Sequence, residues 1–216
     1  DNDLRRKRPI KVNRKILTSD INRVIGNPDI DIVVELVGGI HPAKEFVLRA
    51  IKSGQHVVTA NKALITEHGK EIFDTAMKAG VEVFYEASVG GGIPIIKALR
   101  EGLVANEIDT VLGIVNGTSN YILSCMAEDE LSFSDALEQA KKKGYAERNP
   151  SLDIEGYDSA HKLAILTLLG FGKFVKLEDI YVEGILDISQ NDIRYADEFG
   201  YAIKLLAIAK RRDNDI

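Results

Sequence analysis

The chain has 216 residues, 45% of them hydrophobic and 28% charged, which is typical of one large or two small globular domains and excludes a disordered chain. The formal net charge of -5 argues against nucleic-acid binding, and no apolar stretch approaches the ~20 residues that span a membrane. The single cysteine, Cys125, excludes an intramolecular disulfide framework and a cysteine-based zinc site, and favours a cytoplasmic protein.

The N-terminal segment is charged. Arg5 to Arg8 form a basic run, which we expect to be a solvated loop. The segment has the positive charge of a signal peptide but lacks its apolar region. Because the first residue is not methionine, we expect the chain to be a fragment of a longer protein.

Alternating strands and helices are predicted next. The apolar run 30–37 stops at two glycines and predicts a strand buried on both faces, as in a parallel sheet. Helical spacing over 42–53 and again over 63–79 follows, each helix closed by a glycine. Further strands are predicted at 56–60 and 81–85. This alternation indicates right-handed βαβ units and a parallel sheet.

The pattern changes after residue 86, and we place a domain boundary within 86–92. A buried helix is predicted from about 156 to 170, because nearly every residue from Leu163 onward is apolar. The end of the chain, 201–212, fits a helix or an edge strand, and Gly200 favours the strand. The other predicted elements are a helix at 94–101, a strand at 108–115 and helices at 119–128 and 133–143.

Three predicted strand ends carry glycine or polar residues: Gly38-Gly39, Asn61-Lys62 and Glu86. Parallel sheets bind ligands at the carboxyl ends of their strands. Simple turn chemistry explains the glycines equally well. Lys62 is a stronger candidate, because it follows an apolar strand directly.

The segment 153–162 holds the strongest candidate for chemistry. Asp158 and Lys162 are four residues apart and share a helix face, so they could form a surface ion pair. The same face continues into apolar residues, and the acids Asp153, Glu155 and Glu147 crowd the approach. A lysine among acids beside an apolar helix can relay protons, which favours function over a surface pair. His161, on the opposite side, is expected to be packed or solvated.

Two further segments have alternative interpretations. The glycine-rich loop 86–93 could offer oxygen ligands to a hard cation, although its spacing alone favours a hinge between domains. The segment 116–120 begins a helix after a strand. Its amides and hydroxyls could bind a carboxylate or simply cap the helix.

With these motifs in this order, the chain resembles the homoserine dehydrogenases over essentially its whole length. The matching stretches are Val34 to Gly39, His56 to Lys62, Glu86 to Pro94, Asn116 to Leu123, Gly144 to Glu147 and Asp153 to Lys162. The resemblance implies interconversion of L-homoserine and L-aspartate 4-semialdehyde with NAD or NADP, in the biosynthesis of threonine, isoleucine and methionine.

The resemblance also implies roles for individual residues. Lys162 is the expected catalytic lysine that protonates the aldehyde oxygen, and Lys62 is a second essential lysine beside cofactor and substrate. Asp158 and Glu147 are expected to hold the substrate, with Asp153 supporting them. Further substrate contacts are expected at Gly117, Thr118 and Tyr145, and nucleotide contacts at Gly38 and Gly144. A structural sodium site, held mostly by main-chain oxygens, is expected at Glu86, Val89, Gly91 and Ile93.

The implied fold is α/β. It has an incomplete Rossmann-type parallel-sheet nucleotide-binding domain at 1–86, followed by an α+β catalytic domain at 87–216. The family's first strand, its glycine-rich dinucleotide loop and its C-terminal segment have no counterpart here. We therefore expect residues 1–216 alone to bind NAD(P) poorly and to be inactive, and the full-length protein to be a cytoplasmic homo-oligomer with a small-molecule substrate.

Two other functions remain open. Dehydrogenases of the glucose–fructose oxidoreductase type share the strand–lysine–helix arrangement, but usually carry Glu-Lys-Pro where this chain has Asn61-Lys62-Ala63. A ligand-binding or assembly module on the same fold would be expected to lose Lys162 or Asp158, and both are present.

Overall fold

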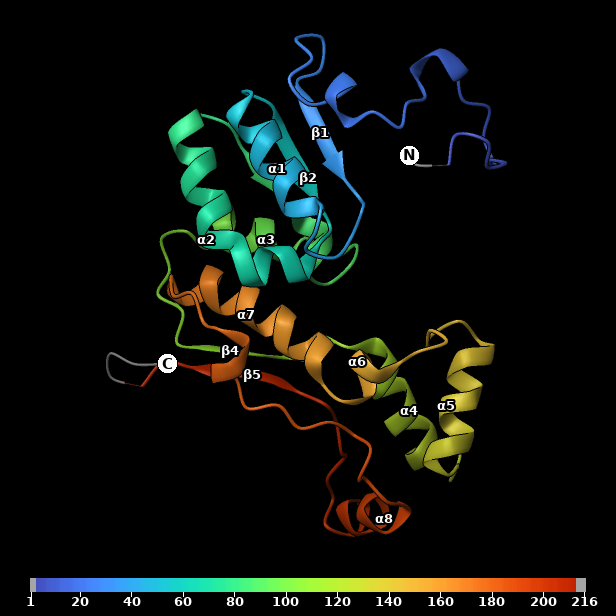
Figure 1. Ribbon diagram of the computed structural model, residues 1–216. Helices are drawn as coiled ribbons and strands as arrows, with labels where there is room; N and C mark the ends of the chain where they lie inside the picture. Colours follow the sequence, from blue (N-terminus) through green and yellow to red (C-terminus); the bar gives the residue numbers. More distant parts are fainter. Residues whose placement is uncertain (1–2, 213–216) are drawn as a thin grey trace. The chain divides into compact units, whose positions relative to one another are not determined.

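The computed structural model describes residues 3–212, which divide into two compact units after Ser88 (Figure 1). Each unit has its own β-sheet and its own packed helices, so the two are described separately. Within residues 3–212, none of the helices combines the length and the apolar character that crossing a membrane requires.

The first unit is built on a parallel sheet of order β1-β2-β3, as the sequence predicts. Val33, Val57 and Val83 are aligned across the three strands and are all buried, so they form one apolar row. The elements are β1 (Ile32–Glu35), α1 (Ala43–Lys52), β2 (His56–Thr59), α2 (Lys62–Ala79) and β3 (Val83–Phe84), with short helical turns at η1 (Arg14–Ile16), η2 (Ile21–Arg23) and η3 (Glu86–Ser88).

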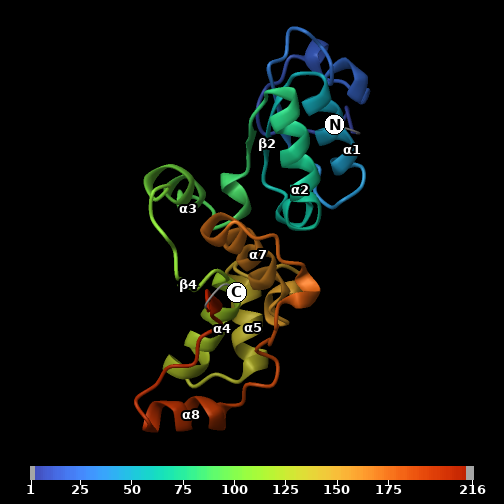
Figure 2. The ribbon, with the colours of Figure 1, turned by 90° about the vertical axis from the view of Figure 1, so that its left-hand side faces the viewer.

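The helices of this unit begin and end where local chemistry requires. The side chain of Asn61 accepts a hydrogen bond from the backbone N–H of Leu64 and caps α2. Gly80 ends α2 in the left-handed conformation, with φ of 68°. Helices α1 and α2 lie side by side (Figure 2), and α1 buries Val47 and Ile51 completely or nearly so.

The expectation that the first strand is buried on both faces is wrong for the described residues. Val34 is 58% exposed and Ile32 56% exposed, whereas their neighbour Val33 is buried. Phe84, aligned with Val34 through Val58, is also largely exposed. The packed helices leave this face of the sheet uncovered, so its apolar residues alternate between core and solvent.

The second unit combines an antiparallel pair of strands with packed helices. Val111 of one strand is aligned with Ala209 of the other, and both lie against Leu163 and Phe171. The elements are α3 (Ile95–Lys97), η4 (Ala98–Gly102), β4 (Thr110–Gly113), α4 (Gly117–Glu128), α5 (Phe133–Lys142), α6 (Ser151–Ile154), α7 (Tyr157–Phe171), η5 (Leu177–Asp179), α8 (Gln190–Glu198) and β5 (Ala207–Lys210).

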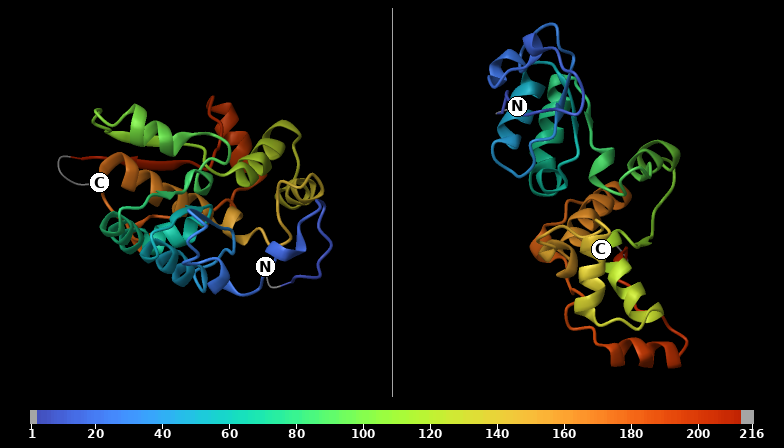
Figure 3. Two further views of the ribbon diagram at one scale, coloured as in Figure 1. Left: turned by 90° about the horizontal axis from the view of Figure 1, so that it is seen from above. Right: turned by 90° about the vertical axis from the view of Figure 1, so that its right-hand side faces the viewer.

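A second apolar cluster joins α4, α5 and α8. Ile122 and Met126 of α4 pack with Ala136 and Ala140 of α5 and with Ile193 of α8. Helices α4 and α5 lie next to each other in the views of Figure 3. Alanine on α5 permits this close approach, because its small methyl side chain adds little distance between the two helix backbones.

Helix α7 is the buried helix that the sequence predicts. Leu163, Ile165 and Leu166 are almost completely buried, whereas Leu169 is only partly buried. The helix begins after Gly156, which is left-handed with φ of 89° and packs against the backbone of Glu183. A side chain at position 156 would therefore meet both backbone strain and a close contact.

Several predicted elements differ in extent from the observed ones. The predicted helix 94–101 is a short α-helix that continues as a π-helical turn, and the predicted strand 108–115 is shorter. At the C-terminal end the strand interpretation is confirmed only for Ala207–Lys210. The preceding Leu205 instead exchanges backbone hydrogen bonds with the side chain of Asn120, which places it outside a strand ladder.

Candidate active site

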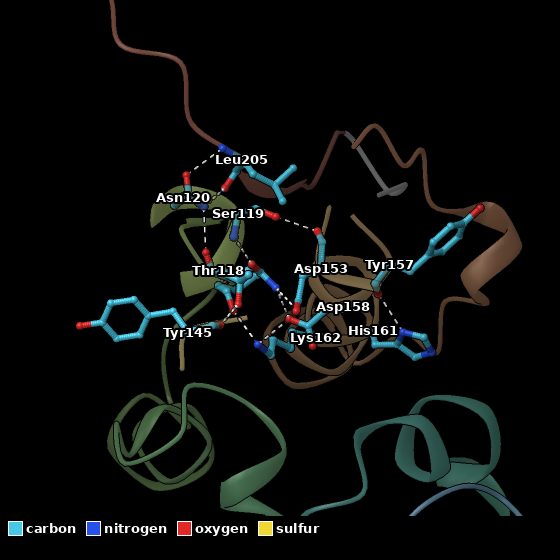
Figure 4. A network of polar contacts seen from close by, with 12 residues as sticks. Thr118, Ser119, Asn120, Tyr145, Asp153, Tyr157, Asp158, His161, Lys162 and Leu205 are labelled. Atoms are coloured by element: carbon cyan, nitrogen blue, oxygen red, sulfur yellow. Dashed lines mark hydrogen bonds and ion pairs between the residues drawn. The ribbon is translucent and has the colours of Figure 1, made fainter. Parts of the chain in front are cut away.

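The centre of the site is an ion pair on the first turns of α7. Lys162 Nζ lies 2.7 Å from Asp158 Oδ2, and the two side chains are 19% and 6% exposed (Figure 4). Lys162 Nζ also donates a 2.7 Å hydrogen bond to the main-chain oxygen of Val115. The pair is therefore held inside the unit and is not the surface salt bridge considered above.

Lys162 keeps donor capacity in this arrangement. An ammonium has three N–H groups, and the contacts to Asp158 and Val115 use two of them. The remaining N–H can donate to a bound molecule. The Lys162 side chain is partly buried, and the contacts to Asp158 and Val115 restrict its ammonium.

Asn116, at the junction of β4 and α4, binds two carboxylates at once. Its Nδ2 donates to Asp153 Oδ1 at 2.7 Å and to Asp158 Oδ2 at 2.8 Å. Its Oδ1 accepts the backbone N–H of Ser119 at 2.8 Å and so caps α4. The sequence interpretation of this segment as a helix cap is confirmed, but the amide contacts to the two acids were not foreseen.

Short helix α6 is tied to the same place. Ser119 Oγ donates to the main-chain oxygen of Asp153 at 2.8 Å (Figure 4). Helices α4, α6 and α7 are thus joined through Asp153, Asn116 and Asp158. Asn116 is 37 and 42 positions from Asp153 and Asp158 in the sequence, so only the folded chain brings α4 to α6 and α7.

The loop after α5 docks on the start of α4. Thr118 Oγ1 donates to the main-chain oxygen of Tyr145 at 2.6 Å. The Tyr145 ring lies 4.8 Å from that of Tyr121, measured between centroids. The loop turns at Gly144, which has φ of 78°, and Glu147 on it is exposed. Gly117 is exposed at the first position of α4.

Tyr121 and Lys143 have shifted pKa values. Hydrogen bonding to Cys125 raises the pKa of Tyr121, and the nearby Tyr121 raises the pKa of Lys143. Lys143 Nζ lies 5.3 Å from the centroid of the Tyr121 ring. Upward shifts keep a tyrosine neutral and a lysine charged at neutral pH, so this cluster supplies packing rather than a titrating group.

The charges of the site are unequal. Asp153 and Asp158 supply two carboxylates, whereas Lys162 supplies one ammonium. Glu147 and Glu155 are close to Asp153 in the sequence and are exposed, and they add negative charge to this part of the chain. A pocket with an excess of negative charge attracts a cationic group such as an amino-acid ammonium. His161 Nδ1 lies 2.8 Å from the main-chain oxygen of Tyr157.

In the first unit, a buried carboxylate shapes the end of β1. Glu35 Oε1 accepts the backbone N–H groups of Val37 and Gly38 at 2.7 and 3.0 Å, and Oε2 accepts the Thr59 hydroxyl at 2.6 Å. Gly38 and Gly39 follow with φ of 78° and 67° and with open space around them. The sequence suggested the glycine turn but not the carboxylate that holds it. A glutamate inside an apolar strand was the available signal.

Lys62 is the first residue of α2, directly after Asn61, and is partly buried. It therefore lies at the carboxyl end of β2, where the sequence places it. Asn61 Nδ2 donates to the main-chain oxygen of Gly39 at 2.6 Å, so the ends of β1 and β2 are joined. This is the edge of a parallel sheet at which nucleotides bind.

The glycine-rich loop has a left-handed backbone at two adjacent glycines. Gly90 and Gly91 are left-handed, with φ of 77° and 59°, and the N–H of Ile93 donates to the oxygen of Gly90 at 3.0 Å. The side chain of Val89 is buried, and Glu86 is partly buried in η3. This geometry is compatible with either a cation loop or a hinge.

Comparison with known proteins now gives the family. Residues 1–86 match the family model described as homoserine dehydrogenase, NAD binding domain, and residues 94–214 match the model described as homoserine dehydrogenase. Both parts of the chain thus point to one family, which decides against the glucose–fructose oxidoreductase type.

Individual relatives agree. The homoserine dehydrogenase of Synechocystis is 50% identical over 202 residues, covering 94% of this chain and 47% of that protein. The crystal structure of a homoserine dehydrogenase from Thiobacillus denitrificans is 54% identical with a TM-score of 0.88, covering 91% of this chain and 46% of that one. A hyperthermophilic archaeal homoserine dehydrogenase in complex with NADPH is 30% identical with a TM-score of 0.71, covering 78% of this chain and 52% of that one.

The chain spans about half the length of the curated relatives that it matches. Within that span, the family model for the second unit covers more than half of the chain, and the residues of the Asn116–Asp153–Asp158–Lys162 network all lie inside it. Sequence, fold and family models lead to the same result: this chain belongs to the homoserine dehydrogenase family.

Proposed function

We propose that this protein catalyses the NAD(P)-dependent interconversion of L-homoserine and L-aspartate 4-semialdehyde. The observation that carries the proposal is the ammonium of Lys162, held 2.7 Å from Asp158 Oδ2 with an N–H left to donate. Reduction of an aldehyde needs one proton donor beside the carbonyl oxygen and a group that stabilises the developing alkoxide. One lysine performs both tasks.

Lys162 acts on the oxygen of the reacting carbon. In the direction of reduction it hydrogen-bonds the aldehyde oxygen and gives it a proton; in the direction of oxidation it takes that proton back. The contacts to Asp158 and Val115 keep the ammonium in place while the proton moves. The nicotinamide cofactor, when bound, supplies or accepts the hydride.

The acids hold the other end of the substrate. Asp158 and Glu147, with Asp153 in support, bind the amino group, because a site with excess negative charge favours an ammonium. We assign further substrate contacts to Thr118, Gly117 and Tyr145. The Thr118 hydroxyl donates a hydrogen bond to the main-chain oxygen of Tyr145, which keeps these segments together. These contacts orient the carbonyl carbon toward the cofactor.

The first unit holds the nucleotide. The Glu35 carboxylate fixes the turn before Gly38, whose left-handed backbone and open surroundings allow a ligand to approach closely. We assign Gly38 and Gly144 to nucleotide contacts, and Lys62 to contacts with both cofactor and substrate. Either NAD or NADP fits these residues.

A sodium ion is proposed at the loop of Glu86, Val89, Gly91 and Ile93, where Gly90 and Gly91 are left-handed and main-chain oxygens are the candidate ligands. It would be structural, because a monovalent ion held by carbonyls is a weak Lewis acid. Replacing sodium by tetramethylammonium should lower the unfolding temperature of the full-length protein. An unchanged unfolding temperature would favour the hinge.

Two further properties are proposed with the function. A cytoplasmic location fits Cys125, a buried free thiol. The full-length protein is proposed to be a homo-oligomer. Fractionation of cells and light scattering of the purified protein test these two statements.

The function is tested with the purified full-length protein. Homoserine oxidation is followed by the absorbance of reduced nicotinamide, with NAD and with NADP separately. Turnover with L-homoserine and none with L-serine is expected. Binding of homoserine by calorimetry without turnover would support the ligand-binding module instead, and the absence of both would contradict the proposal.

A further inference from the structure

Asn116 stands out because every polar atom of its side chain has a partner. It is 2% exposed. Its two Nδ2 N–H groups face two different carboxylates, and its Oδ1 accepts the N–H of Ser119. A buried amide with both donors on ionised acceptors makes strong, directional contacts.

We propose that Asn116 is a positioning residue for the reaction: its neutral amide holds Asp153 and Asp158 together and, through Asp158, sets the place of the Lys162 ammonium. The inference rests on the proposed function. The link to the lysine is short, since Asp158 Oδ2 accepts from Asn116 Nδ2 at 2.8 Å and contacts Lys162 Nζ at 2.7 Å.

Helix capping alone does not require this residue. A cap needs an oxygen that accepts from the first turn, and serine or aspartate supplies one as well as asparagine does. The amide nitrogen is what distinguishes asparagine from them. Here that nitrogen makes the contacts at 2.7 and 2.8 Å, so the cap and the acid contacts are separable by substitution.

The neutrality of the amide has its own effect. Two carboxylates that lie this close repel each other, so a hydrogen-bond donor is needed between them. A lysine or arginine there would also donate, but it would cancel the excess negative charge that favours the substrate ammonium. Asparagine supplies two hydrogen bonds and leaves that charge unchanged.

The test uses two variants that keep the cap. Asn116→Ser keeps an oxygen acceptor and removes the amide donors. Asn116→Asp keeps size and cap but places a third carboxyl group against Asp153 and Asp158. The control is Ser132→Ala, which removes the cap of α5, where the Ser132 side chain accepts from Asp135.

Asn116→Ser is expected to lower kcat/KM for homoserine by about 10- to 100-fold, because hydrogen bonds to charged groups are lost, with most of the effect in kcat. Ser132→Ala should lower the unfolding temperature and leave kcat/KM within about twofold, since capping loss affects stability alone. Asn116→Ser with parental kcat/KM would overturn the proposal.

Asn116→Asp gives a signature that a merely structural role would not. Three carboxyl groups in contact raise the pKa of at least one, so a proton is retained there to higher pH. Protonated, that group donates in place of the amide; once it ionises, the network loses its donor. Activity should therefore be highest at acidic pH and fall as pH rises through the raised pKa, unlike that of the parent and of Asn116→Ser.

The same sign applies to folding. A group with a raised pKa in the folded state stabilises it at low pH and loses that contribution as pH rises. The unfolding temperature of Asn116→Asp should thus fall with pH relative to the parent, a readout that needs no substrate. A parental pH profile in both measurements would overturn the proposal. If the parent protein does not oxidise homoserine, the proposed function fails instead.

Discussion

Glu35 in the first unit and Asp158 in the second are both buried carboxylates, each 4% exposed, but they have different partners. Glu35 accepts from two backbone N–H groups and from the Thr59 hydroxyl. Asp158 contacts the Asn116 amide and the Lys162 ammonium. Glu35 is therefore fixed by the backbone, whereas Asp158 is paired with a side chain that can give up a proton.

The comparison shows that burial of an acid does not by itself indicate chemistry. Backbone donors cannot change their charge, so Glu35 shapes a turn. Lys162 carries an ammonium with donor capacity beyond its protein contacts, so Asp158 holds the group that we propose as the proton donor. A buried carboxylate thus fixes a turn in the first unit and holds the proposed catalytic lysine in the second.

Removing the lysine should have the largest effect. Lys162→Ala in the full-length protein is expected to lower kcat by at least ~100-fold, the scale of a lost general acid, with little change in cofactor affinity. Lys142→Ala, which removes an exposed ion pair with Glu138, is the control. Near-normal turnover of Lys162→Ala would remove this lysine from the mechanism.

Removing acids on the substrate side should have the next largest effect. Asp158→Ala is expected to raise the homoserine KM by about tenfold and to lower kcat as well, because it contacts Lys162. Glu147→Ala should raise KM with kcat retained, since Glu147 is exposed. If KM is unchanged in both variants, these residues do not bind the substrate.

Replacing Glu35 should lower both the stability of the fold and the affinity for the cofactor. Glu35→Gln removes the charge and leaves one acceptor oxygen in place of two, so the bonds from the backbone N–H groups and from the Thr59 hydroxyl cannot all be kept at full strength; it should lower the free energy of unfolding by about 1–3 kcal/mol. NAD(P) affinity should fall while the homoserine KM stays the same. Glu45→Gln, on an exposed ion pair with Arg49, should change stability by less than about 0.5 kcal/mol. Equal effects of the two variants would contradict the structural role of Glu35.

The smallest expected effect depends on pH and concerns Asp192 in α8. Hydrogen bonds from the Ser189 hydroxyl and backbone hold the pKa of Asp192 below its usual range in the capping box of α8. Because its pKa is lower in the folded than in the unfolded state, the ionised carboxylate stabilises the fold at pH values above the unfolded-state pKa. This contribution disappears as the pH falls through the folded-state pKa. Asp192→Asn should therefore lower the unfolding temperature at neutral pH and not near about pH 2. Asp197→Asn, exposed on the same helix, is the control for removing one negative charge from α8.

Much of the fold could be predicted because its signals are local. Helix α2 begins at an asparagine cap and ends at a left-handed glycine, and the sequence shows both. The alternation of strands and helices predicts the parallel sheet correctly. The spacing of Asp158 and Lys162 predicts that they share a helix face, and the apolar residues that follow predict their burial.

The sequence by itself thus determined the family, the order of the elements and the Asp158–Lys162 pair. Only the tertiary structure decided that Val34 is exposed, that Asn116 lies between Asp153 and Asp158, and that Glu35 bonds to Thr59. Periodicity and caps act between residues a few positions apart. The contacts of Asn116 with the two aspartates and of Glu35 with Thr59 join residues 24 to 42 positions apart, and such partners are brought together by packing of whole elements.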